Sequence, residues 1–291
     1  MRLRSGERQT TAAEDLRTGA LDRQRIGDML NLDATTTAAI VAHQASTGRL
    51  FGEAAIELGI VTADQVQRAV EEQQGFSVLE AGDPRIDPLV VSAFDPDDSL
   101  AMSIRALRAM VTGAKRPDGT AVKSIAMLGL DSGAETAVLA ANLAVAFAQT
   151  GYLTLLVDAD LTNPQHHSLF RLGNRAGLTT LLSNASRAEA VAQQSAIKRL
   201  SVVTSGPAVP NASELLDRRR LAAGLEPMLD DYDLVLVDAG DASEGAVSAA
   251  LGLDASILII RRDVTETRVL SRLVDQMETG GLTILGTILV D

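Results

Sequence analysis

The chain has 291 residues, of which 46% are hydrophobic and 22% charged, and this composition predicts a folded protein with a buried core. It contains no cysteine, which excludes disulfides, thiolate metal sites and a catalytic thiol. The formal net charge of −12 argues against nucleic acid as a partner, because binding by phosphate neutralisation requires a basic surface.

The N-terminal residues mix charges and lack the apolar core of a signal peptide. The longest apolar stretch, Ala137 to Ala148, is shorter than the roughly 20 residues that a membrane-spanning helix needs. We therefore expect a cytoplasmic location, and the sequence leaves association with a membrane through a partner open.

The first part of the chain predicts a small helical module. Residues 1–24 are expected to form a flexible tail, and residues 25–82 contain a weak internal repeat. Ile26-Gly27-Asp28-Met29-Leu30 is echoed by Phe51-Gly52-Glu53-Ala54-Ala55. In the second copy, Thr62 and Gln65 are spaced as a capping box. The module should therefore consist of two helix–turn–helix repeats.

Residues 83–98 are rich in proline and aspartate and predict a linker to a second domain over residues 99–291. That domain begins with a helix from Ser99 to about Val111, and apolar runs then alternate with helical stretches. Strands that are apolar on both faces and separated by helices indicate an α/β fold with a mostly parallel sheet flanked by helices. The predicted strands are Ser124–Leu130, Leu153–Asp158, Leu200–Thr204, Leu234–Asp238, Ala255–Ile260 and Thr283–Val290.

Three strand ends carry residues that point to a phosphate site. Gly129 to Gly133 forms a glycine-containing turn that leads into a helix, Asp158 and Asp160 lie at the end of the second strand, and Asp238 ends a later one. Ligands of parallel α/β sheets bind beyond the carboxyl ends of the strands. A strand, turn and helix followed by two Asp-terminated strands is the layout of a P-loop NTPase.

Five segments resemble the cytoplasmic domain of bacterial tyrosine kinases: Ala140–Ala144, Val157–Leu161 with Pro164, Gly206-Pro207, Pro210–Leu216 and Tyr232–Asp238. These kinases belong to the MinD/ParA-like deviant-Walker P-loop family. They work with membrane-embedded co-polymerases that regulate chain length in capsule and exopolysaccharide export. The resemblance covers about residues 95–291 and implies a P-loop NTPase-like fold and a co-polymerase partner. The helical module resembles, more weakly, the N-terminal domain of type II secretion ATPases.

The turn departs from the Gly-Glu-Gly-Lys-Ser/Thr pattern of that family. Alignment on the helix that follows keeps Gly133, but it places Glu135 at the second glycine, Thr136 at the lysine and Ala137 at the hydroxyl that binds magnesium. No Lys or Arg occurs from Ser124 to Phe170. A phosphate about 4 Å from a carboxylate would be repelled by about 4 kcal/mol at an effective dielectric of 20. We therefore expect Mg-ATP binding to be weak or absent.

The resemblance thus implies a vestigial nucleotide site without an assigned catalytic residue, formed by Gly133, Glu135, Thr136, Ala137, Asp158, Asp160 and Asp238. Asp158, Asp160 and Asp238 would be metal ligands only if magnesium is bound. The aspartates also suit strand-end turns and helix caps. His166 and His167 are expected to open a solvated helix, because adjacent positions on a helix do not face one another.

Two further features bear on function. The family carries a Glu-x-x-Arg-x-x-Arg helix at its subunit contacts, and here Arg105 and Arg108 are kept while Met102 replaces the glutamate. The resemblance implies an oligomer or partner contact, and a solvated basic face is the alternative. The family also phosphorylates a C-terminal tyrosine cluster, whereas this chain has only Tyr152 and Tyr232, each close before a predicted strand.

These observations predict a catalytically impaired relative of the kinases, a pseudokinase that acts as the cytoplasmic partner or regulator of a membrane-embedded polysaccharide co-polymerase. A homo-oligomer is compatible with this function. One alternative is an active ATP-dependent tyrosine kinase or ATPase with a non-standard P-loop. Another is a MinD/ParA-like positioning ATPase.

Overall fold

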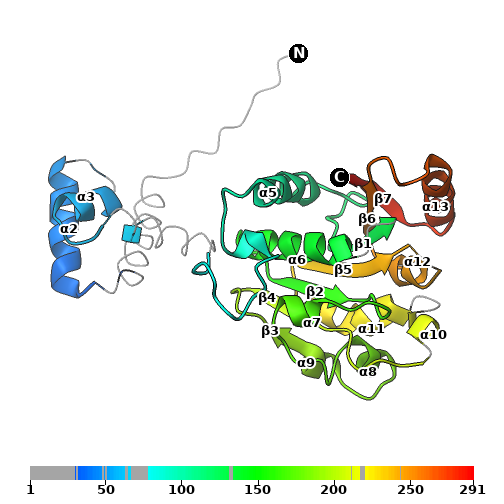
Figure 1. Ribbon diagram of the computed structural model, residues 1–291. Helices are drawn as coiled ribbons and strands as arrows, with labels where there is room; N and C mark the ends of the chain where they lie inside the picture. Colours follow the sequence, from blue (N-terminus) through cyan, green and yellow to red (C-terminus); the bar gives the residue numbers. More distant parts are fainter. Residues whose placement is uncertain are drawn as a thin grey trace, which may run out of the picture. The chain divides into compact units, whose positions relative to one another are not determined.

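The computed structural model describes residues 30, 32–47, 49, 51–62, 65–66, 78–130, 134–210, 212–216, 220–242 and 244–291. The chain divides into two compact units, Met1–Phe76 and Ser77–Asp291, and Figure 1 shows the elements of each. The predicted tail over residues 1–24 lies outside the described residues.

The first unit contains the helices α2 (Ala34–Thr47) and α3 (Phe51–Glu57). Its small core is formed by Ile40, Phe51, Ala54, Ala55 and Val61. The predicted capping box is present: the Thr62 amide donates to Gln65 Oε1 at 2.8 Å, and the Gln65 amide donates to Thr62 Oγ1 at 3.2 Å. The reciprocal bonds satisfy two amides at a helix start.

The second unit is built on a seven-stranded sheet of order β3-β4-β2-β5-β1-β6-β7. All neighbouring strands are parallel except β3 and β4, which confirms the predicted mostly parallel sheet. The short strand β3 was not predicted, because none of its three residues is fully buried and they carry no apolar run. The strands are β1 (Ser124–Leu130), β2 (Thr154–Asp158), β3 (Ala192–Gln194), β4 (Leu200–Val203), β5 (Leu234–Asp241), β6 (Ala255–Arg261) and β7 (Thr283–Val290).

Helices cover both faces of this sheet (Figure 1). Alternate strand residues point to opposite faces, so Ile125 and Met127 of β1 belong to one apolar cluster, whereas Ala126 and Leu128 belong to the other. The first face packs against α5 (Ser99–Thr112), α6 (Ala134–Ala148) and α7 (His166–Leu169). The second packs against α8 (Leu178–Leu182), α9 (Ala188–Val191), α10 (Ala212–Leu216), α11 (Arg220–Leu229), α12 (Glu244–Ala250) and α13 (Thr267–Thr279).

The segment 83–98, which we expected to be a linker, is part of the second unit. It contains the short 3₁₀ helix η1 (Val91–Ala93), and Ile86, Val90 and Ala93 are buried in the core on the α6 side of the sheet. The expectation was wrong because the proline and aspartate residues form exposed turns between these buried positions, and the turns dominate the composition. The second unit therefore begins before residue 83.

Candidate functional site

Two of the expected site residues lie side by side in the middle of the sheet. Asp158 of β2 is the direct cross-strand neighbour of Asp238 of β5. Both residues are buried, with exposed fractions of 0% and 1%. Because the two strands are parallel, the register brings two carboxylates together at the carboxyl edge of the sheet, where α/β proteins bind ligands.

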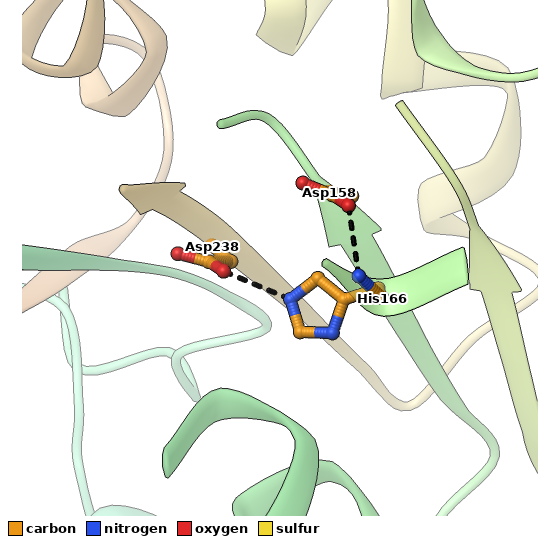
Figure 2. Close-up of side chains that lie close together, drawn as sticks. All are labelled: Asp158, His166 and Asp238. Carbon is orange, nitrogen blue, oxygen red and sulfur yellow. Dashed lines mark hydrogen bonds and ion pairs between the residues drawn. The ribbon is translucent and has the colours of Figure 1, made fainter. Parts of the chain in front are cut away.

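His166 completes this pair, and sequence reasoning missed it. It is the first residue of α7 and its side chain is fully buried, contrary to the expected solvated helix start. Its backbone amide donates to Asp158 Oδ2 at 3.1 Å, and its Nε2 lies 2.9 Å from Asp238 Oδ2. Figure 2 shows the imidazole reaching from α7 toward the Asp238 carboxylate.

The burial of His166 has a local signal. Leu169 and Phe170, three and four residues further on, are buried on the same face, as the helical period requires. His167 is only partly buried, and its Nε2 contacts the Ser168 hydroxyl at 3.2 Å. The pair of histidines is therefore split between the core and the surface, and a periodicity test over residues 166–170 would have found the buried one.

The electrostatics of the cluster favour protonated groups. Burial raises the pKa of Asp158 to about 7, and the charge of Asp238 adds to the effect, while His166 opposes it. Burial lowers the pKa of His166, but the hydrogen bond to Asp238 and the charges of Asp158 and Asp238 outweigh it, so the pKa is raised overall. Two carboxylates without water around them thus require positive charge from a proton or another cation.

Asp160 lies next to this cluster but has a different set of contacts. Its Oδ1 accepts hydrogen bonds from the amides of Thr162 and Asn163 at 3.1 and 2.9 Å, which is the turn-forming role that we considered for it. Gly240 lets the side chain approach, because a Cβ there would lie 2.5 Å from Asp160 Cγ, and its φ is +69°. Burial raises the pKa of Asp160.

The expected phosphate turn is described only from its helical side. Gly133 lies outside the described residues. Thr136 and Ala137 are buried in the first turn of α6, with exposed fractions of 0% and 5%. Glu135, in the same turn, forms an ion pair with Arg261 at the end of β6, with Arg261 Nη2 and Glu135 Oε1 2.5 Å apart.

Arg261 is the second residue that sequence reasoning missed. The count of charges over residues 124–170 found no basic residue, but the parallel pairing of β1 with β6 places Arg261 beside the start of α6. Glu135 is therefore not an uncompensated charge, and the repulsion expected from the sequence alone is an overestimate. No local pattern near residue 135 indicates this partner.

Arg108, one of the two arginines of α5, contacts the neighbouring helix α6. Arg108 is partly buried and donates from Nη1 to the backbone oxygen of Ala146 at 3.2 Å, near the C-terminus of α6, where a cation is favourable. Burial lowers the pKa of Arg108, and the charge of Arg105 adds to the effect. On the same helix, Met102 and Met110 are 51% and 71% exposed. Arg108 thus joins two helices of its own chain.

Among the described residues, no helix is both long and apolar enough to cross a lipid bilayer. No protein-family model matches the chain.

Comparison with known proteins finds bacterial tyrosine-protein kinases among the relatives. The tyrosine-protein kinase YwqD of Bacillus subtilis (strain 168) is 36% identical over 170 residues, which are 58% of this chain and 72% of the relative. The putative tyrosine-protein kinase CapB of Staphylococcus aureus is 31% identical over 153 residues, which are 53% of this chain and 66% of the relative. The match thus spans about two thirds of the length of CapB.

Solved structures also superpose on this chain. The chimerical protein CapA2B2 is 30% identical and superposes with a TM-score of 0.63, covering 76% of this chain and 96% of that chain. The septum site-determining protein MinD from Pyrococcus horikoshii, complexed with Mg-ADP, is 23% identical with a TM-score of 0.50 over 57% of this chain and 69% of that chain, a likeness of fold alone. The chain therefore belongs to the family of bacterial tyrosine-protein kinases.

Proposed function

We propose that this chain is a catalytically impaired member of the family, which acts as the cytoplasmic partner and regulator of a membrane-embedded polysaccharide co-polymerase. The observation that carries the proposal is the Glu135 carboxylate in the first turn of α6. By the alignment given above, this position belongs to a glycine of the phosphate turn, and the neighbouring lysine and hydroxyl positions are Thr136 and Ala137.

The start of a helix attracts anions, because its free amides and dipole present positive charge. Here Glu135 already supplies an anion at that end and is paired with Arg261. A polyphosphate arriving at the turn would meet this carboxylate, and it could use Arg261 only by displacing Glu135. Both requirements weaken nucleotide binding relative to a turn that contains glycine and lysine.

The carboxylates that would hold magnesium also support impairment. In a working P-loop enzyme, acidic strand-end residues hold or order the metal that bridges the phosphates. In this chain, Asp238 is engaged by the imidazole of His166 and Asp158 by the backbone amide of the same residue. These residues suit a cation, and magnesium would bring to the site the charge that stabilises phosphates. To bind it through Asp238 Oδ2, the contact with the His166 imidazole must rearrange.

Calorimetry with Mg-ATP tests the proposal directly. The full chain should bind no tighter than the high micromolar range, and the purified protein should not hydrolyse ATP. Asp238→Ala is the control for contaminating activity. Low-micromolar affinity would contradict the expected loss of nucleotide binding, and steady hydrolysis that disappears in Asp238→Ala would establish an active enzyme. Either result would end the pseudokinase proposal.

A triple variant tests whether the turn is the cause. Glu135→Gly removes the carboxylate and lets the backbone approach a phosphate, Thr136→Lys adds an ammonium group, and Ala137→Thr adds a hydroxyl for magnesium. The three groups act on one ligand, so their effects should be non-additive. We expect measurable Mg-ATP binding in the triple variant and little in each single variant. A folded triple variant that does not bind Mg-ATP would show that residues outside the turn also prevent nucleotide binding.

The second candidate function is an active kinase or ATPase with a remodelled turn. The observation that favours it is Arg261, a cation close to the turn that could contact phosphate if Glu135 moves away. Mass spectrometry of protein from its native host separates the two candidates. The impaired protein should carry no phosphotyrosine, and phosphate on Tyr152 or Tyr232 that is lost in Asp238→Ala would favour the active kinase.

The partner is tested by co-sedimentation with proteoliposomes that contain the co-polymerase encoded in the same host. The full chain should sediment with these vesicles and remain in solution with empty vesicles of the same lipid. Arg105→Glu probes the exposed side of α5, where Met102 and Met110 lie. Equal sedimentation with both kinds of vesicle would show that the chain does not bind the co-polymerase.

A further inference from the structure

The last strand of the sheet has an open edge. β7 is the end strand in the order β3-β4-β2-β5-β1-β6-β7, and no strand among the described residues pairs with its outer edge. Figure 1 shows β7 in red, close to α13. The open edge of a strand presents unpaired amide and carbonyl groups. Soluble proteins usually protect such an edge with charged residues, with proline or with a covering segment.

β7 carries none of these protective side chains. Its eight residues read Thr-Ile-Leu-Gly-Thr-Ile-Leu-Val, without a charge or a proline. Leu289 is 51% exposed, and Gly286 and Thr287 are exposed as well. An exposed edge that is apolar and uncharged over this length favours pairing with another strand. We propose that β7 pairs with β7 of a second copy of this chain, antiparallel and about a two-fold axis, so that the two sheets become continuous.

The regular part of β7 sets the register of this contact. One extra residue, Leu285, forms a bulge in the pairing with β6, and residues 286–290 then follow in unbroken register. A two-fold axis through the middle of this regular stretch pairs all of it, and opposed residues then point to the same face of the sheet. The pairs that result between the two copies are Ile288 with Ile288, Thr287 with Leu289, and Gly286 with Val290.

A hollow beside β7 fits this register. An apolar cleft of about 230 Å³ lies between α5 and the strands β6 and β7. Its lining includes Leu107, Met110 and Val111 of α5, Ile257 of β6, and Gly286 and Ile288 of β7. Apart from the chain neighbours of Gly286, a Cβ there would meet no atom of the described residues within 4 Å, so no side chain fills the space beside this glycine. Val290 of the second copy, opposite Gly286, would cover that space with an apolar group.

Charge favours a second copy in the antiparallel orientation. Two chains of net charge −12 repel each other, and the uncharged β7 is a surface on which they can approach. Asp291 follows the strand and is paired with Arg262 at 2.6 Å. In the proposed register the two Asp291 residues lie about 20 Å apart at 3.4 Å per residue, which exceeds the screening length of about 8 Å. A parallel contact would place them side by side.

Other parts of the chain match this edge less well. Residues 1–29 and 67–77, the longest stretches outside the described residues, contain acidic and basic residues at short intervals, and such residues would bring charge against an apolar edge. The edge also differs from the contact through Arg105 and Arg108 that the family resemblance implies. The inference goes beyond the proposed function and does not depend on it, because the contact requires neither nucleotide nor co-polymerase.

Sedimentation equilibrium of the full chain tests the proposal. Leu289→Lys and Leu89→Lys form a matched pair, because the two leucines are 51% and 55% exposed and only the first lies on β7. We expect the wild-type chain to form a dimer whose population rises with concentration. Leu289→Lys should raise the Kd of the dimer at least about tenfold, since it places a charge in an apolar contact. Leu89→Lys should change the Kd by less than about twofold, as a surface substitution away from the contact.

Charge complementation tests the register. Thr287→Lys and Leu289→Glu each place a charge near the two-fold axis, and each variant alone should self-associate more weakly than the wild-type chain. Mixed in equal amounts, they should form a heterodimer, because the register sets the new ammonium group opposite the new carboxylate. A mixture that stays as weakly associated as the separate variants would refute this register.

A disulfide gives a second test, because the chain contains no cysteine of its own. Ile288→Cys sets two thiols directly opposite each other, within the reach of a disulfide, and Leu89→Cys is the control. Oxidation should convert Ile288→Cys to a covalent dimer and leave Leu89→Cys uncoupled. If circular dichroism shows that Leu289→Lys does not fold, this cross-link decides.

Two results would overturn the contact. One is a dimer that Leu289→Lys leaves intact and that Ile288→Cys does not cross-link, since such a dimer uses another surface. The other is a wild-type chain that stays monomeric up to its solubility limit. In that monomer, hydrogen exchange would show what covers the edge: protected outward amides of β7 would indicate a segment of the same chain, and unprotected ones a different protein.

Discussion

At the scale of single residues, the Glu135 carboxylate controls the charge at the start of α6. Its side chain is 39% exposed and that of its partner Arg261 is 33% exposed. Ion pairs in such partly solvated positions contribute at most about 1 kcal/mol to stability. The pair therefore contributes little to the stability of the fold. Its main effect is the electrostatic repulsion of any anion that approaches the turn.

We predict that Glu135→Gln leaves the fold nearly unchanged and strengthens the binding of pyrophosphate. The substitution removes an anion from the helix start and leaves Arg261 without its partner. The melting temperature should change by no more than about 2–4 °C, the shift that corresponds to about 1 kcal/mol in a domain of this size. Calorimetry checks the affinity, with Glu226→Gln on the exposed side of α11 as a control of equal charge change. Equal affinities in the two variants would contradict the prediction.

The protonation of Asp158 makes stability depend on pH. Its pKa is raised from 3.8 to about 7 in the folded chain, so between these values the folded state holds a proton that the unfolded state releases. The free energy of unfolding must then fall as the pH rises from about 4 to about 7. The raised pKa of His166 acts in the same direction, because its stabilising proton is lost as the pH rises through the folded value.

We therefore predict that Asp158→Asn flattens this pH dependence, because asparagine does not titrate. Urea unfolding in EDTA at pH 5 and pH 8 should show a smaller difference in stability for Asp158→Asn than for the wild-type chain. Asp230→Asn, at an exposed position after α11, should retain the wild-type difference. An unchanged pH dependence in Asp158→Asn would show that other groups dominate.

At the scale of elements, α6 connects the segment before α5 to the sheet. The Ser92 amide donates to Asn142 Oδ1 at 2.8 Å, and Asn142 Nδ2 donates to the Leu89 oxygen at 3.0 Å. About two turns later, Gln149 Nε2 donates to the Ser92 oxygen at 2.7 Å. One polar side chain within this largely apolar helix, and one directly after its end, thus satisfy the irregular backbone around η1.

We predict that Asn142→Ala lowers the free energy of unfolding by about 1–3 kcal/mol, because it leaves the buried Ser92 amide without its acceptor. Urea unfolding of the full chain checks the value. Asn163→Ala, at an exposed position, should have little effect. A loss below about 0.5 kcal/mol, the low end for a single hydrogen bond, would show that water replaces the lost partner.

The elements that could be predicted are those whose own residues determine them. The six long strands are apolar over most of their length, and β1 and β7 have the predicted bounds. By contrast, the packing of residues 83–98 depends on Asn142 and Gln149, which lie 50 and 57 residues after their partner Ser92 in the chain. The burial of His166 and the pairing of Arg261 depend likewise on tertiary neighbours. Strand-end aspartates were predictable, and their actual partners were not.

At the scale of the whole molecule, each apolar cluster is confined to one unit. The cluster around Ile40 and Phe51 uses residues of the first unit alone, and the two clusters on the faces of the sheet use residues from Leu79 onward. A core that is complete within a unit allows that unit to fold alone.

We predict that a fragment of residues 77–291 unfolds at the same temperature as the second unit in the full chain. A fragment of residues 99–291 lacks Ile86, Val90 and Ala93 from the core and should be strongly destabilised, since each large buried side chain contributes a few kcal/mol. Calorimetric melting of both fragments checks this. Equal melting temperatures of the two fragments would show that residues 83–98 are a linker and do not stabilise the core.

The position of the acidic pair has a consequence for amide hydrogen exchange. Asp158 and Asp238 lie on adjacent interior strands, and such strands normally exchange only through global opening. Their histidine, however, lies on a helix of four residues, which can open locally at a far lower free energy. Protons should therefore enter and leave through fluctuations of α7 while the sheet stays closed.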